Sequence, residues 1–195
     1  MNSRFNDGTT DEALMTAAAN DDLAAFELLV SRHQNRVYRM VFHNLRKEED
    51  AWDVSQEIFI KVYNARKSYV EDARFTTWLY RIANNAIIDR LRQFKRSNRN
   101  VSMDDLTAEP EDQGRGSHHH VEHGEMKKQM SAALSNLSER QRGMVILKYY
   151  EGCSVKEIAD VFDCAVGTVK ATLFQAVKHL KNNLAKVGVV SSEVT

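Results

Sequence analysis

The chain has 195 residues, 43% of them apolar, with one proline and eight glycines. That length accommodates one medium domain or two small ones, and so little proline and glycine is typical of a soluble, mostly helical protein. No apolar stretch is long enough to cross a bilayer, and the polar start has no signal-peptide core, so we expect a cytoplasmic protein without membrane insertion. Cys153 and Cys164 lack CxxC spacing, which favours reduced thiols over a disulfide or metal site.

Charge is unevenly distributed although the formal net charge is zero. Residues 1–100 carry 16 Lys or Arg against 14 Asp or Glu, residues 126–195 carry 10 against 6, and residues 101–125 carry 1 against 7. The acidic middle also holds the single proline, Pro110, which favours a flexible linker. We therefore expect an all-α protein in which two small helical domains, 1–100 and 126–195, are joined by the linker 101–125. Because Lys and Arg outnumber Asp and Glu in both domains, a nucleic-acid partner is compatible with a net charge of zero.

Helical spacing of apolar residues predicts four helices before the linker. Their expected ranges are Asp11 to Ala19, Asp21 to Asn44, Glu48 to Arg66 and Thr77 to Ser97, with a loop over Lys67 to Thr76. In the third helix, Ile58, Val62 and Ala65 share one side, whereas Asp53, Gln56, Glu57 and Lys61 face outward.

The tract from Arg74 to Arg99 combines the residue types that handle unpaired DNA bases. Aromatic rings stack on bases, Asn bonds to base edges, and Arg and Lys neutralise phosphate. At about 100° per residue, the fourth helix separates a polar stripe from an apolar side. The stripe holds Arg81, Asn85, Arg92, Lys95, Arg96 and Arg99, and the apolar side holds Leu79, Ile82, Ala83, Ala86, Ile87 and Phe94. The alternative is that Phe75, Trp78 and Tyr80 are ordinary core aromatics beside a solvated charged face.

Two capping boxes organise the C-terminal part. Ser138 with Gln141 opens one helix, which ends near Gly152, and Ser154 with Glu157 opens a short helix, Val155 to Phe162. A turn over 163–165 leads into a longer helix from Val166 to about Leu184. A short helix, a tight turn and a second helix predict a helix-turn-helix, whose second helix reads the major groove with its N-terminal part. A helical hairpin without DNA binding is the alternative.

Regions 2 and 4 of the extracytoplasmic-function sigma factors, a group within the sigma-70 superfamily, resemble two stretches of this chain. The first is DAWDVSQEIFIKVYNA (50–65) followed by FTTWLYRIANNAIIDRLR (75–92). The second is LSERQRGMVILKYYEGCSVKEIADVFDCAVGTVKATLFQAVKHLK (137–181). The resemblance implies a sigma factor that brings RNA polymerase core to promoter DNA and helps to melt it, with an anti-sigma factor as a further partner.

The resemblance also assigns residues to roles. A helix similar to region 2.2 binds the polymerase β′ subunit, and the β subunit is the other core partner; the residues expected there are Asp50, Asp53, Gln56, Glu57 and Phe59. The loop from Ser68 to Thr76 and the helix after it resemble the segment that captures a flipped base of the minus-10 element, where Asn85 matches the family Asn of RIAxN. The expected minus-10 residues are Arg74, Phe75, Trp78, Arg81, Asn84, Asn85, Arg92, Lys95 and Arg96.

The recognition helix departs from the family, because relatives commonly carry several arginines after GTV. Lys170 to Lys178 read KATLFQAVK here, and Arg paired with guanine is the commonest specific contact in the major groove. Base preference in the minus-35 element should therefore differ from that of relatives. The expected minus-35 residues are Thr168, Lys170, Ala171, Thr172, Gln175 and Lys178, with Lys181 nearer the backbone.

The His-rich tract His118 to His123 suggests a metal-responsive linker if it is helical, since His119 and His123 would then lie one turn apart. A solvated tract in a flexible linker is the reading that we favour, with no metal and no cofactor. No nucleophile, base and orienting group can be assembled from the sequence, so we expect no enzyme. A helix-turn-helix regulator without a sigma role is the remaining alternative, although it leaves Trp78 and Asn85 without a function.

Overall fold

The computed structural model describes residues 5, 8–72, 74–97 and 130–186. Every regular element in them is helical, which confirms the all-α prediction. The linker predicted over 101–125, with its histidine tract, lies outside these residues. The elements are α1 (Asp11–Ala19), α2 (Leu23–Leu45), α3 (Glu48–Ala65), the 3₁₀ turn η1 (Arg66–Ser68), α4 (Phe75–Ser97), α6 (Glu139–Val145), the π-helical turn η3 (Ile146–Tyr150), α7 (Val155–Val161) and α8 (Val166–Lys186). A further helical segment covers 130–135.

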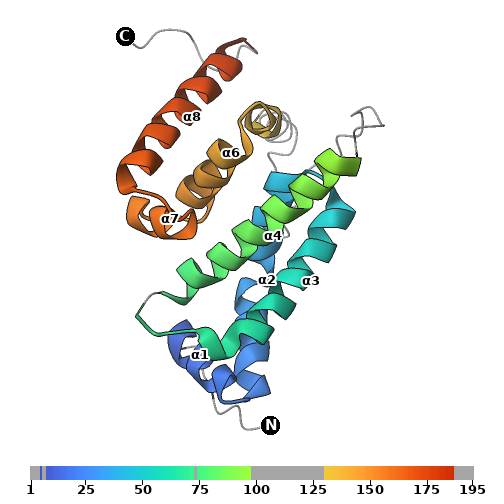
Figure 1. Cartoon of the computed structure of the whole chain (residues 1–195), viewed down its shortest axis with the longest axis vertical. Helices are drawn as coiled ribbons and strands as arrows, with labels where there is room; N and C mark the ends of the chain where they lie inside the picture. The colour runs from blue at the N-terminus through green and yellow to red at the C-terminus, as the bar shows by residue number, and fades with distance from the viewer. Residues whose placement is uncertain (1–4, 6–7, 73, 98–129, 187–195) are drawn as a thin grey trace, which may run out of the picture.

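Helices α1 to α4 form the first unit, a bundle (Figure 1). Side chains of Thr10 and Asp22 accept backbone N–H groups at the starts of α1 and α2, which fixes where both helices begin. The apolar stripes of the four helices meet in a shared core that includes Leu14, Val37 and Ile58, all fully buried. Burial of these stripes, rather than helix propensity, is what stabilises such a bundle.

Helix α4 begins at Phe75, two residues before the predicted start. The carboxylate of Glu12, on α1, accepts the backbone N–H of Phe75 at 2.9 Å. This contact satisfies one of the N–H groups that a helix start leaves unpaired, and it comes from a residue 63 positions away in sequence. Local capping rules could not anticipate it, and it extends α4 toward α1.

The second unit comprises residues 130–186. Both predicted capping boxes are present, at Ser138 with Gln141 and at Ser154 with Glu157. Gly152 ends η3 with a φ of 70°, and the turn between α7 and α8 passes through Asp163 at a φ of 47°. Helices α7 and α8 pack on each other and α8 packs on α6, with Val169 and Ala176 fully buried. The predicted helix-turn-helix is therefore confirmed as a structural motif.

Helix α4 lies between the two units (Figure 1). One side of it packs on α2 and α3, and its other side contacts α7. The end of α2 also contacts α6 and η3. The same helix that carries the predicted minus-10 residues is thus the main contact surface for the second unit.

Helix α3 offers a stability test with a matched control. Ile58 is fully buried in the first unit, whereas Ile60 is 61% exposed on the same helix. We expect Ile58→Ala to lower the free energy of unfolding by about 2–5 kcal/mol, because it leaves a cavity in the core. Ile60→Ala should change it by less than about 0.5 kcal/mol. Urea unfolding followed by circular dichroism measures both, and equal losses would contradict this assignment of the core face.

Candidate nucleic-acid interface

Helix α8 presents one face to the core of the second unit and the other outward, at the edge of the molecule (Figure 1). Val169, Leu173 and Ala176 are buried. Among the predicted minus-35 residues, Thr172 is half-buried and the others are exposed: Thr168, Lys170, Ala171, Gln175 and Lys178. Five of the six predicted residues therefore lie on the face of α8 that points away from the core.

Phe174 was missed by the sequence analysis. It is 69% exposed and lies on the outward face of α8, one turn after Lys170 and Ala171. The C5 methyl group of thymine is an apolar group that the major groove offers to such a ring. Helical spacing could have identified Phe174, because residue 174 lies one turn after residue 170, which was placed on the outward face.

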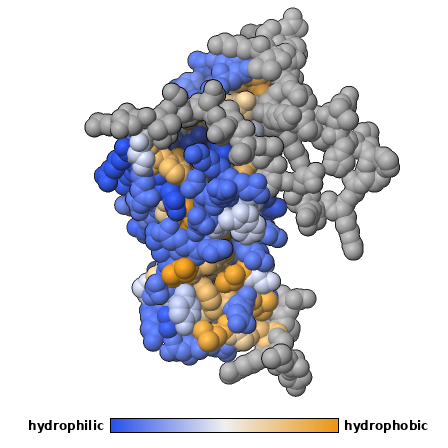
Figure 2. Space-filling model, turned by 90° about the vertical axis from the view of Figure 1, so that its right-hand side faces the viewer, coloured by the Kyte–Doolittle hydropathy of each residue, from blue (hydrophilic) through white to orange (hydrophobic). Residues whose placement is uncertain are grey.

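The outward face of α3 combines polar and apolar side chains. Asp53 and Gln56 are exposed there, and Trp52 and Ile60, one turn to either side of Gln56, are 52% and 61% exposed. Exposed apolar side chains also gather on the lower part of the face shown in Figure 2, which belongs to the first unit. Trp52 and Ile60 were not among the predicted core-binding residues, although their helical positions place both on the outward face.

The remaining predicted core-binding residues have contacts of their own. Glu57 pairs with Lys61 at 2.8 Å, and Asp50 pairs with Arg90 of α4 at 3.3 Å. Phe59 is partly buried against the core. These contacts leave Asp53 and Gln56 as the outward polar residues of the set.

The polar stripe of α4 is exposed as expected. Within the described residues it consists of Arg81, Asn85, Arg92, Lys95 and Arg96, which we call the minus-10 stripe. Leu79, Ala83, Ala86 and Ile87, on the opposite side, are buried. Arg99 lies outside the described residues.

Two of the predicted minus-10 residues, Phe75 and Asn84, are buried. Phe75 is fully buried and Tyr80 is 2% exposed, so the reading as core aromatics holds for these two. Phe75 packs edge-on against His33 and Tyr69, and it offers no free ring face to a base. Asn84 is only 6% exposed, because it faces the second unit rather than water.

Trp78 is the aromatic residue of this set that reaches the surface. It is partly buried and packs against the rings of Tyr69 and Phe75, with ring centroids 5.3 Å and 6.2 Å away. Burial, together with the nearby carboxylate of Glu12 and then those of Glu71 and Asp72, raises the pKa of Tyr69 to about 12, so its phenol is neutral. This cluster anchors the loop before α4.

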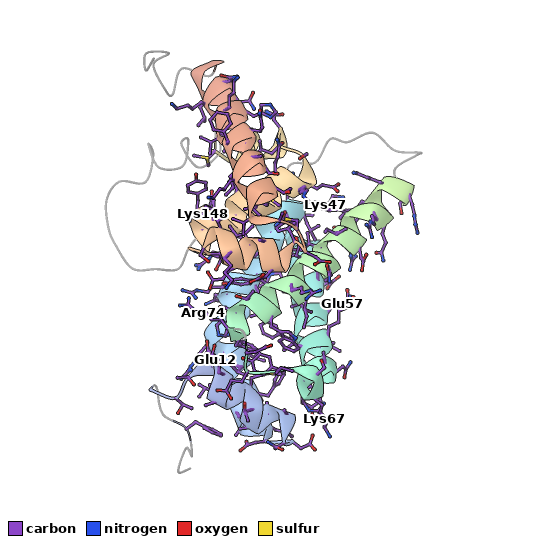
Figure 3. All side chains as sticks on the ribbon, turned by 60° about the vertical axis from the view of Figure 1, so that its left-hand side comes forward. Glu12, Lys47, Glu57, Lys67, Arg74 and Lys148 are labelled. Atoms are coloured by element: carbon purple, nitrogen blue, oxygen red, sulfur yellow. The ribbon has the colours of Figure 1, made fainter. Side chains whose placement is uncertain are left out.

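Three contacts link α4 to glutamates of the second unit. Arg74 pairs with Glu157 at 3.3 Å, Lys95 pairs with Glu139 at 2.7 Å, and the Tyr80 hydroxyl donates to Glu151 at 2.7 Å. Figure 3 shows Arg74 at the start of α4, where this helix meets the second unit. Burial and the charge of Glu151 both raise the pKa of Tyr80, and a hydrogen bond from Ser154 and the nearby Arg74 hold that of Glu157 low.

A pocket of about 410 Å³ lies between the two units. From α4 it is lined by residues that include Arg81, Asn84, Asn85 and Arg92, and from the second unit by residues that include Glu139, Arg140, Phe162 and Asp163. The Phe162 ring packs directly against Gly143, so that a Cβ atom at residue 143 would lie 2.9 Å from Cζ of Phe162. Four predicted minus-10 residues therefore face the second unit across this pocket.

His43 lies at the end of α2, where the first unit meets η3. Its ring packs against Tyr150 with the centroids 4.6 Å apart. Burial and then the charges of Arg46 and Arg39 lower the pKa of His43 to about 4. The imidazole is therefore neutral at neutral pH, and acid would place a third positive charge beside the two arginines.

Neither a metal centre nor a membrane span is found in the part of the chain that the structure describes. No cluster of three or more His, Cys, Asp or Glu side chains there could hold a metal ion. None of the described helices is both long and apolar enough to cross a bilayer.

Two family models match the chain in succession. Residues 29–97 match sigma-70 region 2, and residues 127–180 match sigma-70 region 4. The chain is 33% identical over 183 residues to the ECF RNA polymerase sigma-E factor of Haemophilus influenzae, covering 90% of this chain and 95% of that protein. It is 32% identical over 175 residues to the RNA polymerase sigma-H factor of Pseudomonas aeruginosa, covering 85% and 89%.

Solved structures share the fold. CnrH, in complex with the cytosolic domain of CnrY, superposes with a TM-score of 0.69 at 24% identity, covering 90% of this chain and 97% of that one. The sigma factor RpoE of Bartonella quintana, in complex with the anti-sigma factor NepR, gives 0.68 at 22% identity, covering 82% and 96%. At this identity the likeness concerns the fold.

The neutral state of His43 predicts a pH dependence of stability. The pKa of His43 is about 4 in the folded protein, against an ordinary value of 6.5. The stability that the neutral imidazole contributes is therefore complete above pH 6.5 and is lost as the pH falls toward 4. From pH 7 to pH 5 this group should cost about 1–2 kcal/mol of unfolding free energy. Denaturant unfolding at the two pH values should show a smaller loss for His43→Gln, whereas His179→Gln, at an exposed histidine of α8, should behave like the unmodified protein. A His43→Gln variant with an unchanged pH dependence would contradict the assignment.

Proposed function

The chain belongs to the extracytoplasmic-function sigma factors, the RNA polymerase sigma factors whose regions 2 and 4 follow one another closely, and on that premise we propose how it selects and opens promoters. Region 2 would bind core polymerase and the minus-10 element, and region 4 the minus-35 element. The observation that carries the proposal is the pair of outward helix faces, the minus-10 stripe of α4 and the exposed face of α8, within two matched regions. We place the domain limits near residues 100 and 126.

At the minus-10 element, α4 would capture a base flipped out of the non-template strand. Asn85 is exposed on the stripe, and its amide can bond to a base edge, while Arg92, Lys95 and Arg96 follow it in positions suited to phosphate. Trp78 supports the preceding loop and supplies the ring that is nearest the surface. Flipping costs a few kcal/mol of lost stacking, which these contacts must offset to favour melting.

At the minus-35 element, α8 would lie in the major groove. Lys170 and Lys178 would contact phosphate, and Ala171, Thr172 and Gln175 would read bases. Phe174 adds an apolar group to this face, where a thymine methyl group would complete its burial. Residues 170–178 contain no arginine, so we expect the base preference at the minus-35 element not to rely on contacts between arginine and guanine.

Core polymerase would bind the outward face of α3. Asp53 and Gln56 supply polar contacts, and Trp52 and Ile60 supply the apolar area that a stable interface requires at its centre. We assign this face to the β′ subunit and leave region 4 for the β subunit. Two proteins of the same fold were solved in complex with partners, the cytosolic domain of CnrY and the anti-sigma factor NepR, and we propose that an anti-sigma factor also controls this chain.

Run-off transcription tests the proposed function. Core polymerase plus this protein should yield a specific transcript from the region upstream of its own gene, with no activator that hydrolyses ATP, since autoregulation is frequent in the family. Core polymerase alone is the control. No specific transcript from this or any other promoter tested would refute the sigma role. Tight, sequence-specific binding to duplex DNA without polymerase would favour an ordinary helix-turn-helix regulator instead.

Asn85→Ala tests the base-capture assignment. Open-complex formation, measured by permanganate reactivity of unpaired thymines, should fall roughly 10- to 100-fold because a specific base contact is lost. Affinity for core polymerase should stay unchanged, because Asn85 is not on α3. Asn136→Ala removes another exposed amide, from the second unit, and serves as the control. Equal loss of polymerase binding and promoter melting would refute the base-capture assignment.

A further inference from the structure

Helix α1 carries two acidic side chains that contact other helices. It covers Asp11–Ala19 and therefore lies before residue 29, where the match to sigma-70 region 2 begins. Thr10 caps this helix, which places Asp11 and Glu12 in its first turn. Acidic residues are favoured at the start of their own helix, but these two also reach beyond it, Asp11 to α2 and Glu12 to α4.

Glu12 holds the first residue of α4. Its Oε1 accepts the backbone N–H of Phe75 at 2.9 Å. A helix start leaves N–H groups without partners inside the helix, and the helix dipole also favours a carboxylate there. In Figure 3, Glu12 lies just below Arg74, where α1 meets the start of α4. Because the loop Ser68 to Thr76 passes into α4 at Phe75, this bond fixes where the loop ends.

The ring of Phe75 is held by a second contact that also begins in α1. The Asp11 carboxylate lies 2.7 Å from Nε2 of His33 and 2.8 Å from Nη1 of Arg32, both on α2. His33 is only 3% exposed, and its ring packs edge-on against that of Phe75 with the centroids 5.3 Å apart. Asp11 therefore orients His33, which packs on the same residue whose backbone Glu12 holds.

Phe75 transmits this restraint to residues nearer the surface. Its ring centroid lies 6.2 Å from those of Tyr69 and Trp78, which are themselves 5.3 Å apart. Burial and then the charge of Glu12 raise the pKa of Tyr69 to about 12, in keeping with a Glu12 carboxylate beside this cluster. Arg74, next to Phe75 in sequence, has a side chain that is 77% exposed. The buried Phe75 thus orients Arg74 and Trp78, two residues proposed to contact the minus-10 element.

From these contacts we propose that Glu12 is a positioning residue for promoter opening. Through the N–H of Phe75 it holds the loop Ser68 to Thr76 and Trp78 in the arrangement that captures the minus-10 base. The inference rests on the proposed function, since it adds a residue outside the matched region to the proposed base-capture surface. Such a surface needs supporting hydrogen bonds, because a small displacement of its contact residues weakens all of their contacts together.

Three variants of the full-length protein separate the hydrogen bond from the charge. Glu12→Ala removes the acceptor, whereas Glu12→Gln keeps a carbonyl oxygen at the same reach. Glu27→Ala removes an exposed carboxylate of α2 and is the control. Hydrogen–deuterium exchange of residues 68–80 in the free protein should become roughly 10-fold faster in Glu12→Ala alone, because the Phe75 amide loses its partner and the loop opens locally.

Promoter melting supplies the functional measurement. Permanganate reactivity with core polymerase should show open-complex formation falling roughly 3- to 10-fold in Glu12→Ala, the factor expected for one lost hydrogen bond. Glu12→Gln should recover most of this loss, and affinity for core polymerase should stay unchanged in every variant. A merely structural cap would lower the folded fraction and reduce polymerase binding and melting in parallel. Parallel losses, equal losses in Glu12→Ala and Glu12→Gln, or unchanged exchange at residues 68–80 would each overturn the proposal.

Glu12→Asp provides the same measurements if Glu12→Ala does not fold. It keeps the charge at the start of α4 but is one methylene shorter, so its carboxylate cannot reach the N–H of Phe75 from the present position of α1. Faster exchange and a selective loss of melting should appear again, and behaviour like that of the unmodified protein would count against the proposal.

Run-off transcription by the unmodified protein is a separate result. Its absence refutes the sigma role, whereas unchanged exchange in the Glu12 variants refutes the anchor, so the two failures are distinguishable.

Discussion

The packing of α4 on α2 and α3 is the constraint on which the rest of the molecule depends. Leu79, Ala83 and Ile87 are buried against the bundle, and this fixes the rotation of the helix about its own axis. Once that rotation is fixed, Arg81, Asn85 and Arg92 must point away from the bundle. The face proposed to bind DNA is thus positioned by the opposite, buried face, and the Glu12 bond to the start of α4 adds an anchor at one end.

Much of the fold could be predicted because its determinants are local. The capping boxes at Ser138 and Ser154 identified two helix starts in the second unit, and helical spacing separated the two faces of α3 and α8. The start of α4 was misplaced because its cap is tertiary, from Glu12. Residue patterns carry the periodicity of a helix, but they do not carry contacts across more than sixty positions.

The candidate site was predicted less completely, for a related reason. An aromatic residue beside Asn and Arg has the same sequence signature whether its ring is in the core or on the surface, and Phe75 and Tyr80 proved to be core residues. Asn84 is buried by the second unit, which no pattern within α4 could reveal. Trp52 and Phe174 were not among the predicted contact residues, although their helical positions place both outside.

Gly143 determines how closely α6 and the end of α7 pack within the second unit. Its missing side chain lets the Phe162 ring approach α6 closely, and even one added carbon would meet that ring at 2.9 Å. Phe162 and Asn84, the two residues that such a side chain would meet, also line the pocket between the units. The shape of that pocket therefore depends on a position that does not itself line it, because any side chain at residue 143 would displace the Phe162 ring.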